Sequence, residues 1–260
     1  MVDFLDILVK DARKTIEAGY YEVESVKTGK RHLSLKDSIT KYTYAPIIAE
    51  IKPTSPSHGN LRNISSLKDV AIAMEKGGAA GISVLTEPKH FQGSIKSLVE
   101  VQSHVNLPVL MKDIIIDPVQ IEAASKIGAD AVLLIFSVFD RGHVDCSVHE
   151  MVKLARSKKL EVLLETHTKA QFLSALETEA DLMGINNRDL RTLKVDLKVT
   201  QRLMSSVGVC RKIVVSESGI QNPEDVRFLH ACGAKAFLVG SAVMLADNIE
   251  GKVRELVHAL

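Results

Sequence analysis

Charged side chains and one carboxamide follow short apolar runs at four places in this chain, each where a buried strand would end. In chain order these residues are Glu50 with Lys52, then Lys112, Glu165 and Asn186. Close lysine and glutamate side chains shift each other's proton affinity, which suits general acid–base catalysis. The pattern predicts a proton-transfer site, provided that the fold brings these residues together.

Two glycine-containing segments near the end of the chain predict a phosphate-binding cup. Residues 215–220 and 238–242 each end an apolar run, contain Gly219 or Gly240, and lead into a helix-like pattern. A helix start leaves backbone N–H groups unpaired and positively polarised, and glycine lets an anion approach closely. The simpler interpretation is a pair of ordinary strand-to-helix turns.

Eight strand-then-helix units would bring these residues to one place, and the sequence contains eight apolar, β-branched runs separated by helical patterns and turns. The length of 260 residues is close to the ~250 residues typical of a closed eight-unit barrel. We predict an α/β fold, a single (β/α)8 TIM barrel. The predicted strands are residues 45–51, 81–85, 107–112, 131–135, 160–165, 182–185, 213–216 and 236–239.

The carboxyl ends of barrel strands are where such enzymes place reacting groups. Alternation along the first strand puts Glu50 and Lys52 on one face and Ile51 on the other. If Ile51 faces the helices, both charges face the barrel. Any single one of these charges is explained as well by a solvated loop residue or a neutralising ion pair. Several convergent charges, however, require mutual pairing or a charged ligand.

Residues 1–40 precede the first predicted strand and require a separate explanation. The apolar spacing in their first half predicts an amphipathic helix that covers the bottom of the barrel or guards its mouth. No linker or low-complexity tract divides the chain. We therefore expect one domain over residues 1–260, with residues 1–40 as an N-terminal helical extension and residues 41–260 as the barrel.

The composition argues against several classes of partner. The 33 basic and 32 acidic side chains nearly cancel, and aromatic residues make up only 4% of the chain, so we expect no nucleic-acid binding. Neither an 18-residue uncharged apolar stretch nor a secretory signal is present, so we expect a cytoplasmic protein with no membrane partner. The three cysteines form no CxxC pair, and we expect no metal site. A monomer is the expectation, although the sequence does not determine the oligomeric state.

Longer motifs surround the candidate residues and are specific in combination. The strongest are Lys-x-x-Ser-Pro-Ser over residues 52–57 and Gly-Ile-Asn-Asn-Arg-Asp-Leu over residues 184–190. On these motifs the chain resembles the indole-3-glycerol phosphate synthase family of tryptophan biosynthesis, from the first strand to the end of the barrel. Further matches lie at residues 48–52, 83–88, 91, 93–94, 110–113, 163–168, 216–220 and 239–241.

The resemblance implies ring closure of 1-(2-carboxyphenylamino)-1-deoxyribulose 5-phosphate, with loss of carbon dioxide and water. Lys112 matches the family's catalytic lysine and would protonate the developing alkoxide. The iminium formed in the substrate is its own electron sink, so no cofactor is expected. Glu165 would act as base in the dehydration, and either Lys52 or Lys112 as the acid; Lys52 could instead hold the substrate carboxylate. Glu50 and Asn186 match positioning residues.

The resemblance also implies residues around the phosphate and the aryl ring. Arg188 is expected to brace the loop that holds Asn186. Leu134 alternates with the candidate wall residue Leu133, so the strand register decides which of the two faces the ring. The expected phosphate-binding residues are Ser55, Ser218, Gly219, Gly240 and Ser241, and the candidate walls for the aryl ring are Pro56, Phe91, Leu133 and Leu238.

Two residues depart from the family pattern. Ile114 stands where the family usually has Phe, and Pro53 where a basic residue is common. Neither change removes a proton-transfer group, so we expect altered substrate affinity or loop mobility with activity retained.

Three other functions share parts of this pattern. Phosphoribosylanthranilate isomerase and the α subunit of tryptophan synthase have a phosphate cup, but they would not need the cluster of Glu50, Lys52 and Lys112. A Schiff-base aldolase would use one of these lysines as its nucleophile. A noncatalytic phosphate sensor would have little need for Glu165.

Overall fold

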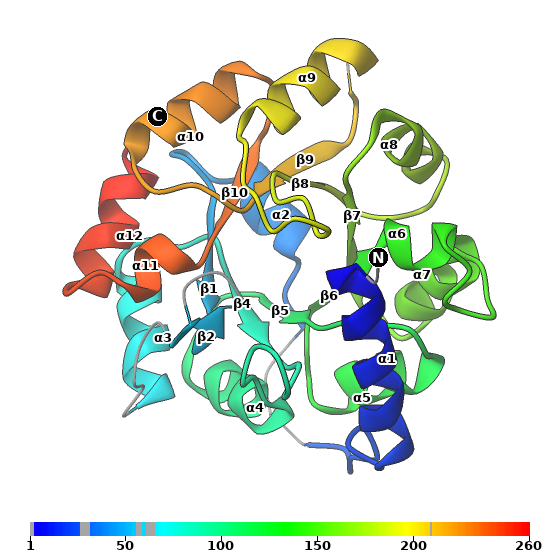
Figure 1. Ribbon diagram of the computed structural model, residues 1–260. Helices are drawn as coiled ribbons and strands as arrows, with labels where there is room; N and C mark the ends of the chain where they lie inside the picture. Colours follow the sequence, from blue (N-terminus) through cyan, green and yellow to red (C-terminus); the bar gives the residue numbers. More distant parts are fainter. Residues whose placement is uncertain (1–2, 27–31, 56–58, 61–65, 209) are drawn as a thin grey trace.

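Within the described residues, which are 3–26, 32–55, 59–60, 66–208 and 210–260 of a computed structural model, eight parallel strands close into a barrel. Helices surround the strands (Figure 1), so the predicted TIM barrel is confirmed. The barrel strands are β1 (Ile47–Ile51), β4 (Gly81–Leu85), β5 (Val109–Lys112), β6 (Ala131–Ile135), β7 (Glu161–Thr166), β8 (Leu182–Asn186), β9 (Ile213–Glu217) and β10 (Ala236–Val239).

The predicted strand positions agree with the barrel strands to within two residues at each end. The largest differences are at β1 and β5, which begin directly after Pro46 and Pro108 rather than two residues earlier. Proline has no N–H to donate to a neighbouring strand. Its carbonyl still accepts, because Phe237 N donates to Pro46 O and Ile82 N donates to Pro108 O.

Short polar residues begin many of the outer helices. Ser66, Ser94, Asp117 and Thr168 each accept a backbone N–H in the first turn of the following helix. Local sequence thus sets where each helix begins and how long each loop at the barrel mouth is. The helices are α3 (Leu67–Lys76), α4 (Ile95–His104), α5 (Pro118–Lys126), α6 (Phe136–Asp140), α7 (Val148–Ser157), α8 (Lys169–Leu176), α9 (Lys198–Val207), α10 (Pro223–Ala231), α11 (Ser241–Met244) and α12 (Ile249–Val257).

Alternation along the strands divides the core into two apolar layers. In β6, Val132 and Leu134 belong to the layer between strands and helices, whereas Leu133 and Ile135 belong to the layer inside the barrel. The strand register in the structure therefore points Leu133, and not Leu134, into the barrel. Ile51 likewise packs in the outer layer, which turns Glu50 and Lys52 inward as predicted.

The N-terminal residues supply a helix to each end of the barrel. Helix α1 (Phe4–Glu17) lies at the mouth, where Phe4 and Leu8 line a cavity. Helix α2 (Leu35–Thr40) lies at the opposite end, where Ser34 Oγ donates to Glu161 Oε1 at the start of β7 (2.5 Å) and Ser38 Oγ donates to Ala80 O just before β4 (2.5 Å). The sequence analysis predicted one extra helix, either at the bottom of the barrel or at its mouth. The structure has a helix at each of these two positions.

A small two-stranded sheet lies between β1 and α3 in the sequence. Strands β2 (Thr54–Ser55) and β3 (Gly59–Asn60) pair in an antiparallel manner.

Among the described helices, none combines the length and the apolar character needed to cross a membrane.

Candidate active site

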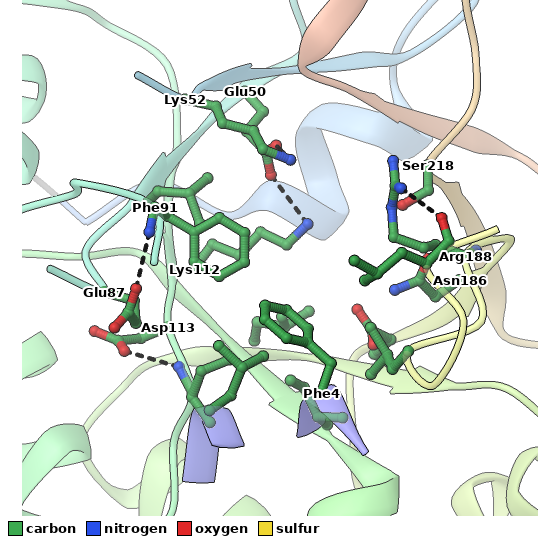
Figure 2. A pocket seen from close by; sticks show the side chains of 18 residues that line it. Phe4, Glu50, Lys52, Glu87, Phe91, Lys112, Asp113, Asn186, Arg188 and Ser218 are labelled. Atoms are coloured by element: carbon green, nitrogen blue, oxygen red, sulfur yellow. Dashed lines mark hydrogen bonds and ion pairs between the residues drawn. The ribbon is translucent and has the colours of Figure 1, made fainter. Parts of the chain in front are cut away.

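A cavity at the carboxyl ends of the strands, here called the central cavity, contains the predicted ionisable residues. Glu50 and Lys52 enter it from β1 and the residue beyond it, Lys112 from β5, Glu165 from β7 and Asn186 from β8. Figure 2 shows Glu50, Lys52 and Lys112 directed toward one space, across from Asn186. Residues far apart in the sequence thus converge as predicted.

Lys112 lies between two buried carboxylates. Its Nζ is 3.0 Å from Glu50 Oε2 and 3.4 Å from Glu217 Oε2, while Lys52 Nζ is 3.7 Å from Glu50 Oε1. Glu50 is only 3% exposed and Glu217 is fully buried. The pairs are therefore shielded from water, and their mutual electrostatic effects are strong.

The pKa values of the two lysines in this cluster are shifted in opposite directions. Burial by itself would lower the pKa of Lys112, but the carboxylates of Glu50, Glu217 and Glu165 raise it above the ordinary lysine value. The pKa of Lys52 is lowered, first by burial and then by the positive charges of Lys112 and Arg188, against the opposing effect of Glu50. Lys112 thus holds its proton firmly, whereas Lys52 releases its proton more readily.

Glu217 is a site residue that the sequence analysis missed. Burial, together with the neighbouring carboxylates of Glu165 and Glu50, raises the pKa of Glu217 to about 8 even though Lys112 opposes the shift. Glu217 therefore ionises less readily than an ordinary glutamate, in contrast to Glu50, whose pKa is lowered. Alternation could have found it, since Glu217 shares a strand face with Val215, which lies inside the barrel.

Glycine at position 184 makes room for the Glu217 carboxyl group. A Cβ at Gly184 would collide with Glu217 Oε1 and would approach Glu165 Cα to 3.0 Å. The glycine of the motif at residues 184–190 therefore shapes the site by its lack of a side chain.

Asn186 and Arg188 lie on the opposite side of the central cavity (Figure 2). Arg188 N donates to Asn186 Oδ1 at 2.9 Å, and Arg188 Nη1 donates to Leu193 O at 2.9 Å. The guanidinium group therefore ties down the loop after β8, and the backbone of the same residue orients the carboxamide. This is the arrangement that the expected bracing role of Arg188 requires.

A second hollow, here called the cup, adjoins the central cavity. Both are lined by Glu50, Lys52, Lys112, Arg188, Leu193 and Ser218, and the cup adds Gly219, Gly240, Ser241 and Leu238. Leu238 lines the cup, and its candidate role as a wall for the aryl ring stays a prediction. The predicted phosphate residues after β9 and β10 lie together.

The two glycine segments of the cup differ in structure. Gly240 is the N-cap of α11, as the helix-start prediction requires. Gly219 instead has a φ of +90° in a loop, and α10 begins only at Pro223, so the prediction of a helix start at Gly219 is wrong. A Cβ at Gly219 would also collide with Val195. This position therefore needs glycine for its backbone conformation and for space.

Asn187 holds the cup side of β9 in place. Its Nδ2 donates to Ser216 Oγ (2.9 Å), Glu217 O (3.0 Å) and Ser218 O (3.2 Å), and its Oδ1 accepts from Thr200 Oγ1 (2.8 Å). Ser218 has a φ of +67°, which is uncommon for a residue with a side chain. The buried amide thus stabilises a strained residue at the edge of the cup.

The apolar wall of the central cavity includes residues that the sequence analysis did not assign. Phe91 and Leu133 line the cavity as predicted, and Lys52 Nζ lies 5.5 Å from the centroid of the Phe91 ring. The buried Glu87 carboxylate accepts the backbone N–H groups of residues 89, 90 and 91, which fixes the loop that carries Phe91. The unassigned wall residues are Phe4, Leu8, Leu85, Ile114, Ile135, Leu190 and Leu193.

Two predicted residues cannot be placed at the site. Pro56 lies outside the described residues, and so does the side chain of Ser55, whose backbone belongs to β2. Ile114, the departure from the family pattern, lines the central cavity, where the aromatic rings of Phe4 and Phe91 are also present. Among the described residues, no group of three or more His, Cys, Asp or Glu side chains is arranged to hold a metal ion.

Comparison with known proteins identifies the family. A family profile described as indole-3-glycerol phosphate synthase matches residues 5–256. The chain belongs to the indole-3-glycerol phosphate synthase family. The resemblance based on the motifs of the sequence is thereby confirmed, and the match includes α1, the helix at the barrel mouth.

Curated members of the indole-3-glycerol phosphate synthase family are similar over most of their length. The protein from Methanocaldococcus jannaschii is 42% identical over 254 residues, which is 96% of this chain and 91% of the relative. That from Methanopyrus kandleri is 45% identical over 82% of this chain and 83% of the relative. That from Endomicrobium trichonymphae is 38% identical over 97% of this chain and 98% of the relative.

Solved structures outside the indole-3-glycerol phosphate synthase family share the barrel fold. A thiamine phosphate pyrophosphorylase from Pyrococcus furiosus superposes with a TM-score of 0.60 at 17% identity, covering 86% of this chain and 96% of that structure. An N-acetylmannosamine-6-phosphate 2-epimerase from Clostridium perfringens gives 0.59 at 16% identity, covering 82% and 92%. At these identities the likeness concerns the fold alone.

Proposed function

We propose that this chain closes the indole ring of 1-(2-carboxyphenylamino)-1-deoxyribulose 5-phosphate to give indole-3-glycerol phosphate. The observation that carries the proposal is the position of Lys112, 3.0 Å from Glu50 and 3.4 Å from Glu217, in a cavity that continues into the glycine-containing cup. One end of the substrate reacts by proton transfer, and the other end carries an anionic phosphate. The central cavity suits the reacting end, and the cup suits the phosphate.

Lys112 is the acid of the first step. When the aryl carbon attacks the C2′ ketone, the carbonyl oxygen takes a proton from the Lys112 ammonium group. The surrounding carboxylates raise the pKa of Lys112, so the ammonium form is present before the reaction begins. The same effect argues against a Schiff-base mechanism, which needs a neutral amine.

Glu50 is the residue that orients both lysines. Its two oxygens lie near Lys112 and Lys52 respectively, so one carboxylate sets the positions of both ammonium groups. The pKa of Glu50 is lowered, because the two lysines outweigh the effect of burial. It stays ionised and acts by positioning rather than by proton transfer.

Lys52 and Glu165 serve the later steps. Attack by the aryl carbon forms the new carbon–carbon bond and leaves an iminium cation. The bond from that carbon to the carboxylate then breaks, and its electron pair neutralises the iminium and restores the aromatic ring as carbon dioxide leaves. In the dehydration, Lys52 donates the proton that leaves with the C2′ hydroxyl group as water, and Glu165 takes a proton from C1′, so that the double bond of the indole forms between C1′ and C2′. We assign the acid role to Lys52 because its lowered pKa makes it the readier donor.

Ser218, Gly219, Gly240 and Ser241 hold the phosphate, with Arg188 and Lys52 adding positive charge beside the cup. Backbone N–H groups and hydroxyl groups are good partners for phosphate oxygens, and nearby cations strengthen their hold. The aryl ring lies at the other end, against Phe91, Leu133, Phe4 and Leu8.

We also propose that residues 1–260 work as a single domain, because α1 and α2 bury apolar residues against the two ends of the barrel. A single cooperative unfolding transition, followed both by circular dichroism and by proteolysis of α1, is the expected result. Separate loss of α1 before the barrel unfolds would refute this.

Fluorescence of the indole product tests the proposed function. The purified chain is mixed with 1-(2-carboxyphenylamino)-1-deoxyribulose 5-phosphate, and the appearance of indole-3-glycerol phosphate is followed beside the variants Lys112→Ala and Glu165→Gln. Turnover by the parent, with loss in both folded variants, is the expected outcome. Absence of turnover in the parent would contradict the proposed function, and full activity in Lys112→Ala would remove the acid assignment.

A further inference from the structure

Glu165 and His167 lie on the same face of the barrel mouth, two residues apart at the end of β7. The same spacing brings Glu50 with Lys52, and Asn186 with Arg188, into the central cavity. His167 was part of a family-like motif, yet neither the motif nor the proposed mechanism gives it a function.

The side chains of Glu165 and His167 have unused hydrogen-bonding atoms that face each other. Glu165 Oε1 and both ring nitrogens of His167 are buried and have no hydrogen-bond partner within the described part of the chain. His167 Nε2 is 3.5 Å from Glu165 Oε1, which is just beyond a well-formed hydrogen bond. Buried polar groups are nearly always paired, so a small rotation that joins these two atoms is strongly favoured.

Hydrogen bonds that do not involve the imidazole hold the backbone around His167. His167 N donates to Gln171 Oε1 at 3.1 Å, and Gln171 is itself bonded to Ser137 and Asp140. Thr166 Oγ1 donates to Gly184 O at 2.8 Å, which fixes the end of β7 against β8. The histidine is therefore anchored beside the carboxylate by contacts that do not involve its ring.

We propose that His167 is the positioning residue for Glu165, donating a hydrogen bond from Nε2–H to Glu165 Oε1. This inference rests on the proposed function, in which Glu165 is the base of the dehydration. With Oε1 held by His167, the other carboxylate oxygen is directed at the substrate. In this arrangement Nε2 is the ring nitrogen that carries the donated proton.

The charges on either side explain why the carboxylate needs this donor. On the side of the central cavity, the Glu165 carboxylate is close enough to Lys112 to raise the pKa of that lysine, as Glu50 and Glu217 also do. Without His167, the carboxylate is drawn toward the ammonium group of Lys112 and away from the substrate. A hydrogen bond from the opposite side balances that attraction.

The other side of His167 borders a separate cavity with charged groups of both signs. Asp140, Arg141, Arg188, Asp189 and Arg191 all line it together with His167. The described structure gives no hydrogen bond from any of these five side chains to the imidazole. Glu165 is therefore the carboxylate that the ring engages.

Steady-state kinetics of His167→Leu and His167→Gln test the proposal. Leucine removes the donor, and glutamine keeps an N–H at a similar distance. We expect kcat to fall about tenfold or more in His167→Leu while KM changes less than about twofold, and His167→Gln to regain most of the lost kcat. Equal losses in the two variants, or an unchanged kcat in His167→Leu, would overturn the proposal.

A double-mutant cycle separates positioning from general packing. If His167 acts through Glu165, adding His167→Leu to Glu165→Gln lowers kcat no further, whereas a packing role gives the same additional loss in both backgrounds. An additional loss as large as in the parent background would contradict the proposal. Thermal unfolding of every variant shows that the comparison is made between folded proteins.

Nitrogen NMR of the histidine ring gives a test that does not depend on turnover. In the parent, the ¹⁵N signals of His167 are expected to show the Nε2–H tautomer with a hydrogen-bonded proton, and Glu165→Gln is expected to change them. Unchanged signals would refute the contact even if His167→Leu failed to fold. If the parent made no indole-3-glycerol phosphate, the proposed function would fail while this measurement still decided the contact.

Discussion

The two ends of the barrel are each covered by a helix from the N-terminal residues, but by different kinds of contact. At the bottom, Leu35 of α2 is fully buried, and a Cβ at Gly81 would approach its Cδ1 to 2.6 Å, so the packing leaves no spare room. At the mouth, α1 lines the central cavity with Phe4 and Leu8. Figure 1 shows α2 behind the strands and α1 beside them.

Charged contacts hold α1 at its edges. Asp11 pairs with His90 (3.0 Å) and Lys89 (3.6 Å), and Arg141 pairs with Asp3 and Asp6. Pairs of this kind at the surface contribute little stability and are screened by salt. The comparison teaches that the bottom is built for stability, while the mouth combines an apolar wall, held by buried residues of α1 and by surface ion pairs, with a cluster of buried charges that costs stability and supplies chemistry.

The largest effect should come from the charged cluster at the mouth. Lys112→Ala is expected to lower kcat by about 10²–10⁴-fold, because the first step loses its positioned acid. Steady-state turnover measures this. Lys36→Ala, which changes a lysine of α2 at the bottom, is the matched control and should leave kcat unchanged. A similar loss in both variants would break the functional distinction between the two ends.

The apolar bottom should show the next largest effect, on stability. Leu35→Ala is expected to lower the free energy of unfolding by about 2–5 kcal/mol, since it leaves a cavity in a fully packed region. Denaturant unfolding measures the change, and KM should be unaffected. Leu8→Ala is the counterpart at the mouth, where we expect a smaller stability loss and a raised KM. A raised KM in Leu35→Ala would argue against the view that the bottom of the barrel serves stability and the mouth serves substrate binding.

A buried carboxyl group beneath the mouth should make the stability depend on pH. Asp113 accepts hydrogen bonds from Tyr21 Oη (2.9 Å) and Thr86 Oγ1 (2.5 Å), and burial raises its pKa to about 6. Between about pH 4 and 6 the folded protein holds a proton that the unfolded chain has released. The free energy of unfolding contributed by this group therefore falls as pH rises through that range.

Asp113→Asn tests the pH effect, because an amide cannot titrate. The stability of the parent relative to Asp113→Asn should fall by up to about 3 kcal/mol between pH 4 and pH 7. Urea unfolding of both proteins at several pH values gives the difference. A constant difference across this range would show that Asp113 is ionised throughout.

The smallest effect should come from the surface contacts of α1. The pKa of Asp11 is lowered to about 2, chiefly by hydrogen bonds from Lys14 and His90. Asp11→Asn weakens the contact with the loop that carries Phe91. At low salt the KM of the variant is therefore expected to be about twofold higher than that of the parent. At high salt this difference is expected to disappear, because the ion pairs of the parent are then screened. Asp37→Asn, which removes an exposed pair of α2 with Lys41, should leave KM unchanged. A salt-independent rise would contradict the assignment.

Much of the fold was predictable from local patterns. The barrel strands were located because their apolar runs and turn signals are local properties, and the largest shifts of their starts are at the prolines at positions 46 and 108. The inward direction of Glu50 and Lys52 followed from alternation alone. The site was predicted in part, since residues at known strand ends must meet once the barrel closes.

What the sequence by itself determined is the order of strands and helices, the faces of the strands, and the presence of lysines and carboxylates at one end. Only the tertiary structure decided that Glu217 shares Lys112 with Glu50, that Phe4 and Leu8 line the central cavity, and that Leu238 faces the cup. The physical reason is that some of these features depend on residues close in the sequence and others on residues brought together by folding. Alternation and capping depend on neighbours along the chain, whereas ion pairing, burial and pKa depend on distances between strands that are set when the barrel closes.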